Sequence, residues 1–148
     1  MELISGPTYE EMLHPSKIDT ARRQAATALR QTDPLHWMNL YNISWRDTND
    51  EISHLVIPKE ITNIDAEIVA LVGSRFPTGS HKVGATYSVT MEAQLASGIE
   101  PGRDTLIFPS TGNYGIGGAW VGTRMGYDTL VLVPELMSEE RFRLIESY

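Results

Sequence analysis

The most distinct pattern in the chain is a series of three short apolar runs, each closed by glycine or proline. The runs are Ile-Val-Ala-Leu-Val at 68–72, Thr-Leu-Ile-Phe at 105–108 and Thr-Leu-Val-Leu-Val at 129–133. Strands that are buried on both faces of a parallel sheet have this composition and length. We therefore predict three buried strands in the second half of the chain.

Helical patterns separate and follow these strands. Apolar residues recur every four positions after the first run, a glycine-rich helix is expected at about 115–125, and Ser138 can cap a last helix. The first helical stripe comprises Val83, Tyr87, Met91 and Leu95. The resulting β-α-β-α-β-α order predicts an α/β fold, with an open twisted parallel sheet between two helical layers.

The first 65 residues are less regular, and we expect them to form a helical and irregular segment packed on a core made by residues 66–148. A helix capped by Ser16 is predicted at 17–31, and a short strand at 41–45. The segment 54–61 reads as extended, without an identifiable partner strand.

Two loops follow the carboxyl ends of the first two predicted strands. They are Pro-Thr-Gly-Ser-His-Lys at 77–82 and Ser-Thr-Gly-Asn-Tyr-Gly at 110–115. Ligands of parallel α/β sheets bind at this edge, and the amides that begin each following helix favour an anion. Lys82 is unusual there because the helix dipole repels a cation, whereas a neutral amine at this place suits imine formation with a carbonyl cofactor.

Common nucleotide-binding motifs do not account for these loops. The order Gly79-Ser80-His81-Lys82-Val83 differs from a Walker phosphate loop in the position of the lysine and lacks the following hydroxyl. The glycines at 112, 115, 117 and 118 do not have the spacing of a dinucleotide fingerprint. The four histidines, at 14, 36, 54 and 81, lack the local ligand pairs of a metal site, so no metal is expected.

Composition narrows the classes of function. The chain has no cysteine, a formal net charge of −7 and no basic cluster, so neither thiolate chemistry nor binding to nucleic acid or anionic membranes is expected. The N-terminus lacks the pattern of a signal peptide, and no apolar run reaches the ~20 residues that span a bilayer. We expect a cytoplasmic protein.

The two loop motifs, in this order and context, resemble those of the fold-type II pyridoxal-phosphate enzymes. That family includes cysteine synthase, threonine synthase, serine/threonine dehydratase and the tryptophan synthase β subunit. The resemblance covers about residues 66–148, and the segment from Gly117 to Tyr148 is most similar to cysteine synthase. It implies pyridoxal 5′-phosphate as cofactor and an amino acid as substrate.

The resemblance also implies roles for individual residues. Lys82 matches the lysine that binds the cofactor covalently and moves protons at the substrate α-carbon. Asn113 matches the asparagine that donates a hydrogen bond to the pyridoxal 3′-oxygen, and His81 is placed for a phosphate contact. The loop matched to the substrate carboxylate comprises Ser110, Thr111, Gly112, Asn113 and Tyr114.

Departures from the family pattern leave the exact reaction open. Val83 and Gly84 follow Lys82 where cysteine synthases have Asp-Arg, and Tyr114 replaces a smaller threonine. The resemblance implies β-elimination or β-replacement on a serine-derived amino acid. The alternatives are a reaction like that of threonine synthase, a dehydratase or tryptophan synthase β.

The family's phosphate cradle and the Ser/Thr that faces the pyridine nitrogen belong to a later part of the fold than this sequence covers. The expectation is therefore an N-terminal portion or a split subunit, which acts as a homodimer or with a complementing C-terminal segment. A non-catalytic module of the same fold is the further alternative.

Overall fold

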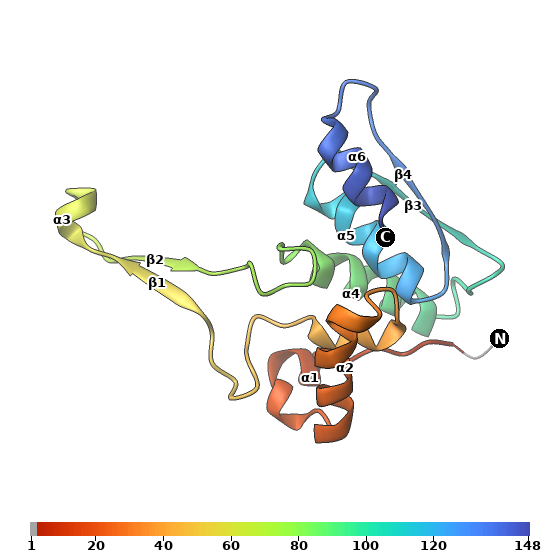
Figure 1. The fold of residues 1–148 in the computed structure, drawn as a ribbon, viewed down its shortest axis with the longest axis horizontal. Helices are drawn as coiled ribbons and strands as arrows, with labels where there is room; N and C mark the ends of the chain where they lie inside the picture. The colour runs from red at the N-terminus through yellow and green to blue at the C-terminus, as the bar shows by residue number, and fades with distance from the viewer. Residues whose placement is uncertain (1–2) are drawn as a thin grey trace.

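The computed structural model describes residues 3–148, which form an α/β fold with two small sheets (Figure 1). The first half contains helix α1, the 3₁₀ helices η1 and η2, helix α2, and a strand pair joined through helix α3. The second half alternates helices and strands. In chain order the elements are α1 (Tyr9–Leu13), η1 (Pro15–Lys17), α2 (Thr20–Thr32), η2 (Trp37–Asn42), β1 (His54–Ile57), α3 (Lys59–Thr62), β2 (Ile68–Leu71), α4 (Lys82–Leu95), β3 (Thr105–Pro109), α5 (Asn113–Arg124), β4 (Asp128–Leu132) and α6 (Glu139–Glu146).

Strands β3 and β4 pair in parallel, as expected for two strands joined by a helical crossover. Helix α5 lies against one face of the pair, where Phe108 is buried beside Gly118 and Thr129 lies beside Gly122. The other face carries the exposed side chains of Ile107, Leu130 and Leu132. Within residues 3–148, helices therefore cover one face of this sheet.

The predicted strand at 68–72 forms, but it does not join the parallel sheet. Strand β2 pairs antiparallel with β1, and the two make a hairpin-like arm that projects from the body of the molecule (Figure 1). An apolar run specifies that a strand needs cover on both faces, and it does not specify the neighbouring strand. Residues 54–57 of the segment expected to be extended, which had no assigned partner, supply that neighbour, whereas residues 59–62 form α3 and not extended chain.

Two further expectations for the first half are wrong. Helix α2 begins after Asp19, whose carboxylate accepts the Arg22 amide at 3.0 Å, and not after Ser16. The strand expected at 41–45 does not form, because residues 37–42 make η2 and residues 43–45 are irregular. The side-chain amide of Asn39 stabilises this turn, because its NH2 group lies within hydrogen-bonding distance of the carbonyls of Asp33, Pro34 and His36.

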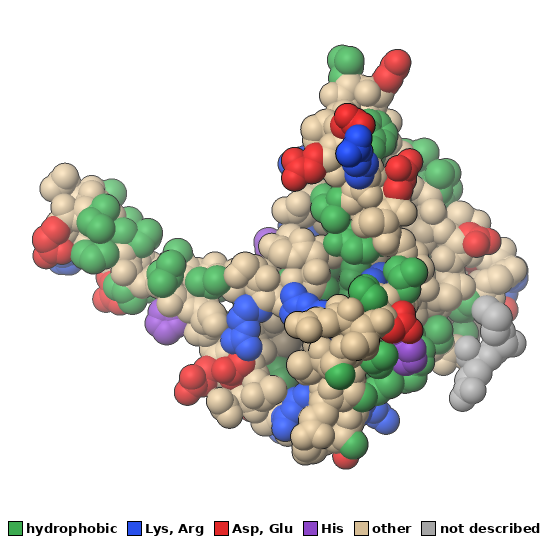
Figure 2. Space-filling model, viewed as in Figure 1, with side chains coloured by type: hydrophobic (Ala, Val, Ile, Leu, Met, Phe, Trp, Pro, Cys, Tyr) green, Lys and Arg blue, Asp and Glu red, His purple; other side chains and the backbone are tan. Residues whose placement is uncertain are grey.

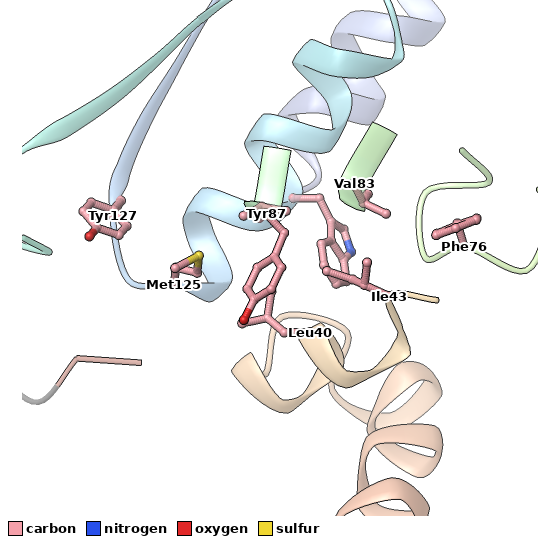
Figure 3. Close-up of a cluster of buried hydrophobic side chains, with 9 residues drawn as sticks. Leu40, Ile43, Phe76, Val83, Tyr87, Met125 and Tyr127 are labelled. Carbon is pink, nitrogen blue, oxygen red and sulfur yellow. The ribbon is translucent and has the colours of Figure 1, made fainter. Parts of the chain in front are cut away.

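The core lies between α4, α5 and η2 (Figure 3). Val83 and Tyr87 of the predicted α4 stripe are fully buried, whereas Leu95 at its end is exposed. The remaining buried members of the cluster are Leu40, Ile43, Phe76, Trp120, Val121, Met125 and Tyr127. The hydroxyl of Tyr87 donates to the Pro7 carbonyl at 2.8 Å, which holds the N-terminal segment on α4.

Arg124 is a buried cation at the end of α5. Its guanidinium lies over the ring of Trp120, 4.1 Å from the centroid, and near the ring of Tyr148. Burial lowers the pKa of Arg124 to about 10. None of the helices within residues 3–148 has the length and apolar character required to cross a bilayer.

Candidate active site

Lys82 is the first residue of α4, and its backbone is fixed from both sides. The hydroxyl of the buried Ser80 accepts a hydrogen bond of 3.3 Å from the Lys82 amide, and the hydroxyl of Thr86 donates one of 3.1 Å to the Lys82 carbonyl. The lysine side chain itself is exposed. Its amine has no hydrogen bond or ion pair with any of residues 3–148, so it is available to a ligand.

The second loop turns sharply from β3 into α5. The Gly112 amide donates to the Ser110 hydroxyl at 3.3 Å, and Asn113 is the first helical residue. Gly115 lies directly beneath the Ser110 carbonyl, where a side chain would collide with the backbone. The Thr111 carbonyl accepts a hydrogen bond of 2.7 Å from Arg141 of α6. The loop is thus held on both sides while the Asn113 side chain stays exposed.

Gly117 brings the two loops together. A Cβ built on Gly117 would lie 3.1 Å from the Val83 nitrogen and 3.2 Å from the Lys82 carbonyl oxygen. Since Gly117 is about one helical turn beyond Asn113, the first turns of α4 and α5 lie side by side. The glycine at 117 thus permits the close approach of α5 to the start of α4, which carries Lys82.

Two of the predicted site residues, Tyr114 and His81, pack against aromatic side chains of the protein itself. The ring of Tyr114 meets Phe108 edge to face, with centroids 5.8 Å apart, so its bulk rests partly on β3. His81 stacks on Trp45, with centroids 5.6 Å and an interplanar angle of 24°. Trp45 in turn meets the ring of Phe76. The structure therefore groups His81 with the aromatic residues before α4, and its contact with a phosphate stays a prediction.

The charge pattern of the site suits an anionic ligand. Neither α4 nor α5 has an acidic residue in its first turn, and neither N-cap residue, His81 or Gly112, accepts a side-chain hydrogen bond from its helix. Backbone N–H groups at such helix starts bind phosphate or carboxylate groups. An exposed amine beside two such helix starts fits a phosphorylated aldehyde such as pyridoxal phosphate. Within residues 3–148 no cluster of three metal-ligating side chains occurs.

Sequence reasoning missed Arg141. Its hydrogen bond to Thr111 spans 30 positions and joins an exposed helical residue to a loop carbonyl. No motif of residue types signals such a contact, because any donor of suitable length on α6 would satisfy it.

Comparison with known proteins identifies the class to which this fold and site belong. The model of the family described as "Pyridoxal-phosphate dependent enzyme" matches residues 60–148. This range contains both loops and more than half of the chain. The chain therefore belongs to the pyridoxal-phosphate-dependent enzyme family, and the fold-type II resemblance is confirmed.

Individual relatives point to one branch of that family. The chain is 37% identical over 91 residues to cystathionine beta-synthase of Saccharomyces cerevisiae, an alignment that covers 62% of this chain and 18% of the yeast protein. It is 33% identical over 106 residues to cysteine synthase 3 of Caenorhabditis elegans, covering 70% of this chain and 32% of that protein. It is 36% identical over 72 residues to a probable cysteine synthase of Bacillus subtilis, covering 49% and 23%.

A solved structure agrees with these relatives. The crystal structure of O-ureido-L-serine synthase superposes with a TM-score of 0.56 at 28% identity, covering 65% of this chain and 30% of that one. The chain thus spans less than a third of the length of each of these proteins.

Proposed function

We propose that this chain forms one side of a pyridoxal-phosphate enzyme that catalyses β-replacement or β-elimination on a serine-derived amino acid. The observation that carries the proposal is the contact of Gly117 with the Lys82 backbone, which puts the lysine beside the asparagine loop. The names of the relatives support the substrate class. Cysteine, cystathionine and O-ureido-L-serine are all alanine skeletons with a substituent on the β-carbon.

Residues of the first loop are assigned to the cofactor and to proton transfer, and residues of the second loop to the cofactor ring and the substrate carboxylate. Bound pyridoxal phosphate supplies the electron sink for chemistry at the substrate α-carbon. Lys82 would hold the cofactor and move the proton at that carbon, and Asn113 would donate a hydrogen bond to the ring oxygen. The hydroxyls and amides of Ser110, Thr111, Gly112 and Tyr114 bind the substrate carboxylate. Helix dipoles at both helix starts favour this anion.

The rest of the assignment follows from the same proposal. The enzyme acts as a lyase or transferase in amino-acid biosynthesis in the cytoplasm. It works as a homodimer or with a complementing C-terminal part. Its cofactor site needs groups that the two loops do not supply, since the helix starts offer amides for one or two anionic groups but no partner for the pyridine nitrogen.

Covalent labelling tests the proposal directly. The chain has only three lysines, at 17, 59 and 82. After incubation with pyridoxal phosphate and reduction with borohydride, peptide mass spectrometry should find the pyridoxyl group at Lys82. Lys82→Ala should remove the label and the visible absorption of the bound cofactor. Lys59→Ala, in an exposed ion pair with Asp65, is the matched control and should keep both.

The measurement is made on the protein isolated from its own cells as well as on the recombinant chain. Equal labelling of all three lysines, or retention of the label in Lys82→Ala, would remove Lys82 from the proposed role. Absence of label from both preparations would instead favour a non-catalytic module of this fold.

A further inference from the structure

Four of the nine arginines in the chain line one cavity, which lies where the arm formed by β1, α3 and β2 joins the body. The cavity has a volume of about 250 Å³, and Figure 2 shows Lys and Arg side chains gathered on this face. It is bounded by α2, by the segment that enters the arm and by the segment that leaves it. The four residues are Arg23, Arg30, Arg46 and Arg75. They are far apart in the sequence, so only the fold brings them together.

The positive charge of this arginine-lined cavity is not balanced by the protein. Asp47 is the only carboxylate among the lining residues, and it lies 3.9 Å from Arg75. Within residues 3–148, no carboxylate lies within 4.0 Å of the guanidinium group of Arg23, Arg30 or Arg46. Four guanidinium groups and one carboxylate leave a formal charge of +3 here, in a chain whose net charge is −7. Because like charges held close together repel one another, an anion that enters the cavity is stabilised.

The fold holds each of these guanidinium groups in place through a neutral acceptor. The hydrogen bonds run from Arg23 to the Pro15 carbonyl at 3.3 Å, from Arg30 to the carbonyls of Arg75 and Phe76 at 3.0 and 3.4 Å, from Arg46 to the Asp50 carbonyl at 2.7 Å, and from Arg75 to the Ser53 hydroxyl at 3.2 Å. A guanidinium group has five N–H donors. Within residues 3–148 each group therefore keeps most of its donors for a ligand.

Size and charge together define the ligand of the arginine-lined cavity. Pockets for drug-sized molecules measure about 300–1,000 Å³, so this cavity suits a smaller one. Arginine pairs with the oxygens of phosphate groups through two parallel hydrogen bonds. A phosphate ester carries a charge of about −1.5 to −2 at neutral pH, so one or two phosphoryl groups balance the arginines within this volume.

The cavity is separate from the two loops of the candidate active site but is connected to the first of them. None of residues 77–82 or 110–115 lines it. Arg30 donates to the carbonyls of Arg75 and Phe76, which directly precede the first loop, and the Gly79 amide donates to the same Phe76 carbonyl at 2.8 Å. A ligand that binds Arg30 and Arg75 therefore joins α2 to the turn that leads toward Lys82.

We propose that the arginine-lined cavity binds a small phosphate-containing anion, and that this anion steadies the turn from Arg75 to Gly79. The ligand is inorganic phosphate, pyrophosphate or the phosphoryl group of a small metabolite, which share the chemistry that the guanidinium groups recognise. This second site goes beyond the proposed function, because its binding and its effect on the turn are measured without added pyridoxal phosphate.

Calorimetric titration with pyrophosphate tests the site. The protein and its variants are expressed from their own gene in their own cells, isolated and freed of phosphate. Arg23→Gln and Arg30→Gln should each weaken the binding of pyrophosphate by roughly tenfold or more, because each removes charge-assisted hydrogen bonds. Arg143→Gln removes the same charge from the exposed face of α6, away from the cavity, and should change the affinity by less than about twofold.

Asp47→Asn provides a test with the opposite sign. It removes the one carboxylate that lines the cavity, so pyrophosphate should bind roughly threefold more tightly. A general loss of folding cannot strengthen binding in this variant and weaken it in Arg23→Gln. Absence of pyrophosphate binding, or an affinity that Arg23→Gln and Arg30→Gln leave unchanged, would overturn the site.

Competing anions define the ligand more closely. Citrate, a tricarboxylate, should bind roughly tenfold more weakly than pyrophosphate if the guanidinium groups select phosphoryl oxygens. Equal affinities would show a general attraction for polyanions and contradict the phosphate assignment. Inorganic phosphate and glycerol phosphate distinguish a free phosphate from a phosphoryl group that a metabolite carries, and tighter binding of either one supports the site and identifies its source.

Hydrogen exchange tests the connection to the turn before Lys82. The amides of Phe76 and Gly79 donate to the carbonyls of Gly73 and Phe76, and saturating pyrophosphate should slow the exchange of both by roughly threefold or more. Arg30→Gln should remove this protection. Binding without slower exchange would disprove the effect on the turn. Labelling of Lys82 by pyridoxal phosphate is a separate measurement, so the proposed function and this anion site can fail independently.

Discussion

The α-carbon of Gly117 faces the carbonyl group of Lys82 so closely that any side chain at position 117 would force the two backbones to shift by a few tenths of an ångström. The distances from a Cβ built at Gly117, 3.1 Å to the Val83 nitrogen and 3.2 Å to the Lys82 oxygen, are shorter than ordinary van der Waals contacts. Both groups belong to the backbones of regular helices, which cannot move aside as a flexible side chain does. The position of the lysine relative to the asparagine loop therefore depends on this glycine.

Gly117→Ala should push α4 and α5 apart. We expect a loss of about 1–3 kcal/mol in the free energy of unfolding, as for other overpacked sites, together with weaker labelling of Lys82 by pyridoxal phosphate. Urea denaturation and borohydride trapping measure the two effects.

Gly84→Ala is the matched control within α4, because the nearest atom to its Cβ would be the Ile43 Cγ2 at 3.7 Å. That substitution should be neutral, or should stabilise the helix by up to about 1 kcal/mol. Equal effects of the two substitutions would show that the contact between Gly117 and Lys82 does not determine the geometry of the site.

Arg141 should restrain the asparagine loop. Its guanidinium donates to the Thr111 carbonyl at 2.7 Å, and Arg141→Ala removes this tie between α6 and the loop. Hydrogen exchange at the amides of Gly112 and Gly115, which donate to the Ser110 hydroxyl and the Gly112 carbonyl, should accelerate by roughly fivefold. This factor corresponds to about 1 kcal/mol, the usual net contribution of one hydrogen bond.

Arg143→Ala on the same helix is the control for the loss of an arginine. Arg143 is exposed and pairs with Glu139 at 2.5 Å, and among the described residues its side chain makes no hydrogen bond to the loop. Unchanged exchange in Arg141→Ala, or the same acceleration in Arg143→Ala, would exclude the loop restraint.

Local pattern was sufficient to predict the second half of the chain. The spacing of Val83 and Tyr87 predicted α4, which buries the face that this pattern marks. The apolar runs at 105–108 and 129–133 predicted β3 and β4, but within residues 3–148 these strands are covered on one face and not on both as expected. Lys82 could likewise be chosen from its place at the start of a helix, whereas Asn113 was assigned through the resemblance to the family. Whether they bind the cofactor remains a prediction.

Pairing and long-range contacts could not be predicted in the same way. The run at 68–72 indicated a strand that needs cover on both faces, yet its neighbour is set by the connection through α3 back to 54–57. The turn at 37–42 is held by the side-chain amide of Asn39, whose NH2 group lies within hydrogen-bonding distance of the carbonyls of Asp33, Pro34 and His36. Such contacts depend on tertiary geometry, which residue type and spacing do not encode.

The base of the arm should loosen in acid. The Asp47 carboxylate accepts hydrogen bonds from the backbone amides of Glu51 and Asn49, at 3.0 and 2.8 Å. These hydrogen bonds lower the pKa of Asp47 below its ordinary value. Arg75, in the loop after β2, lies 3.9 Å from the same carboxylate. The Asp47 side chain thus joins the segment that enters the arm to the segment that leaves it.

Because the folded-state pKa is depressed, the turn has its full stability above the ordinary aspartate pKa, about 4. This stability is lost as the pH falls from there through the lower folded value. The amide NMR signals of Asn49 and Glu51 should shift, and their hydrogen bonds should open, in that pH window. Asp47→Asn keeps an oxygen acceptor but does not titrate. In this variant the NMR signals of both amides should therefore no longer change with pH in this window.

Asp50 titrates in the same loop, and its pKa is lowered chiefly by the hydroxyl and amide of Ser16. Asp50→Asn is therefore measured in parallel, and it should leave the acid-dependent shift of the Glu51 amide in place. If the amide response persists in Asp47→Asn and disappears in Asp50→Asn, the acid sensitivity of the arm belongs to the contact with Ser16 and not to the Asp47 turn.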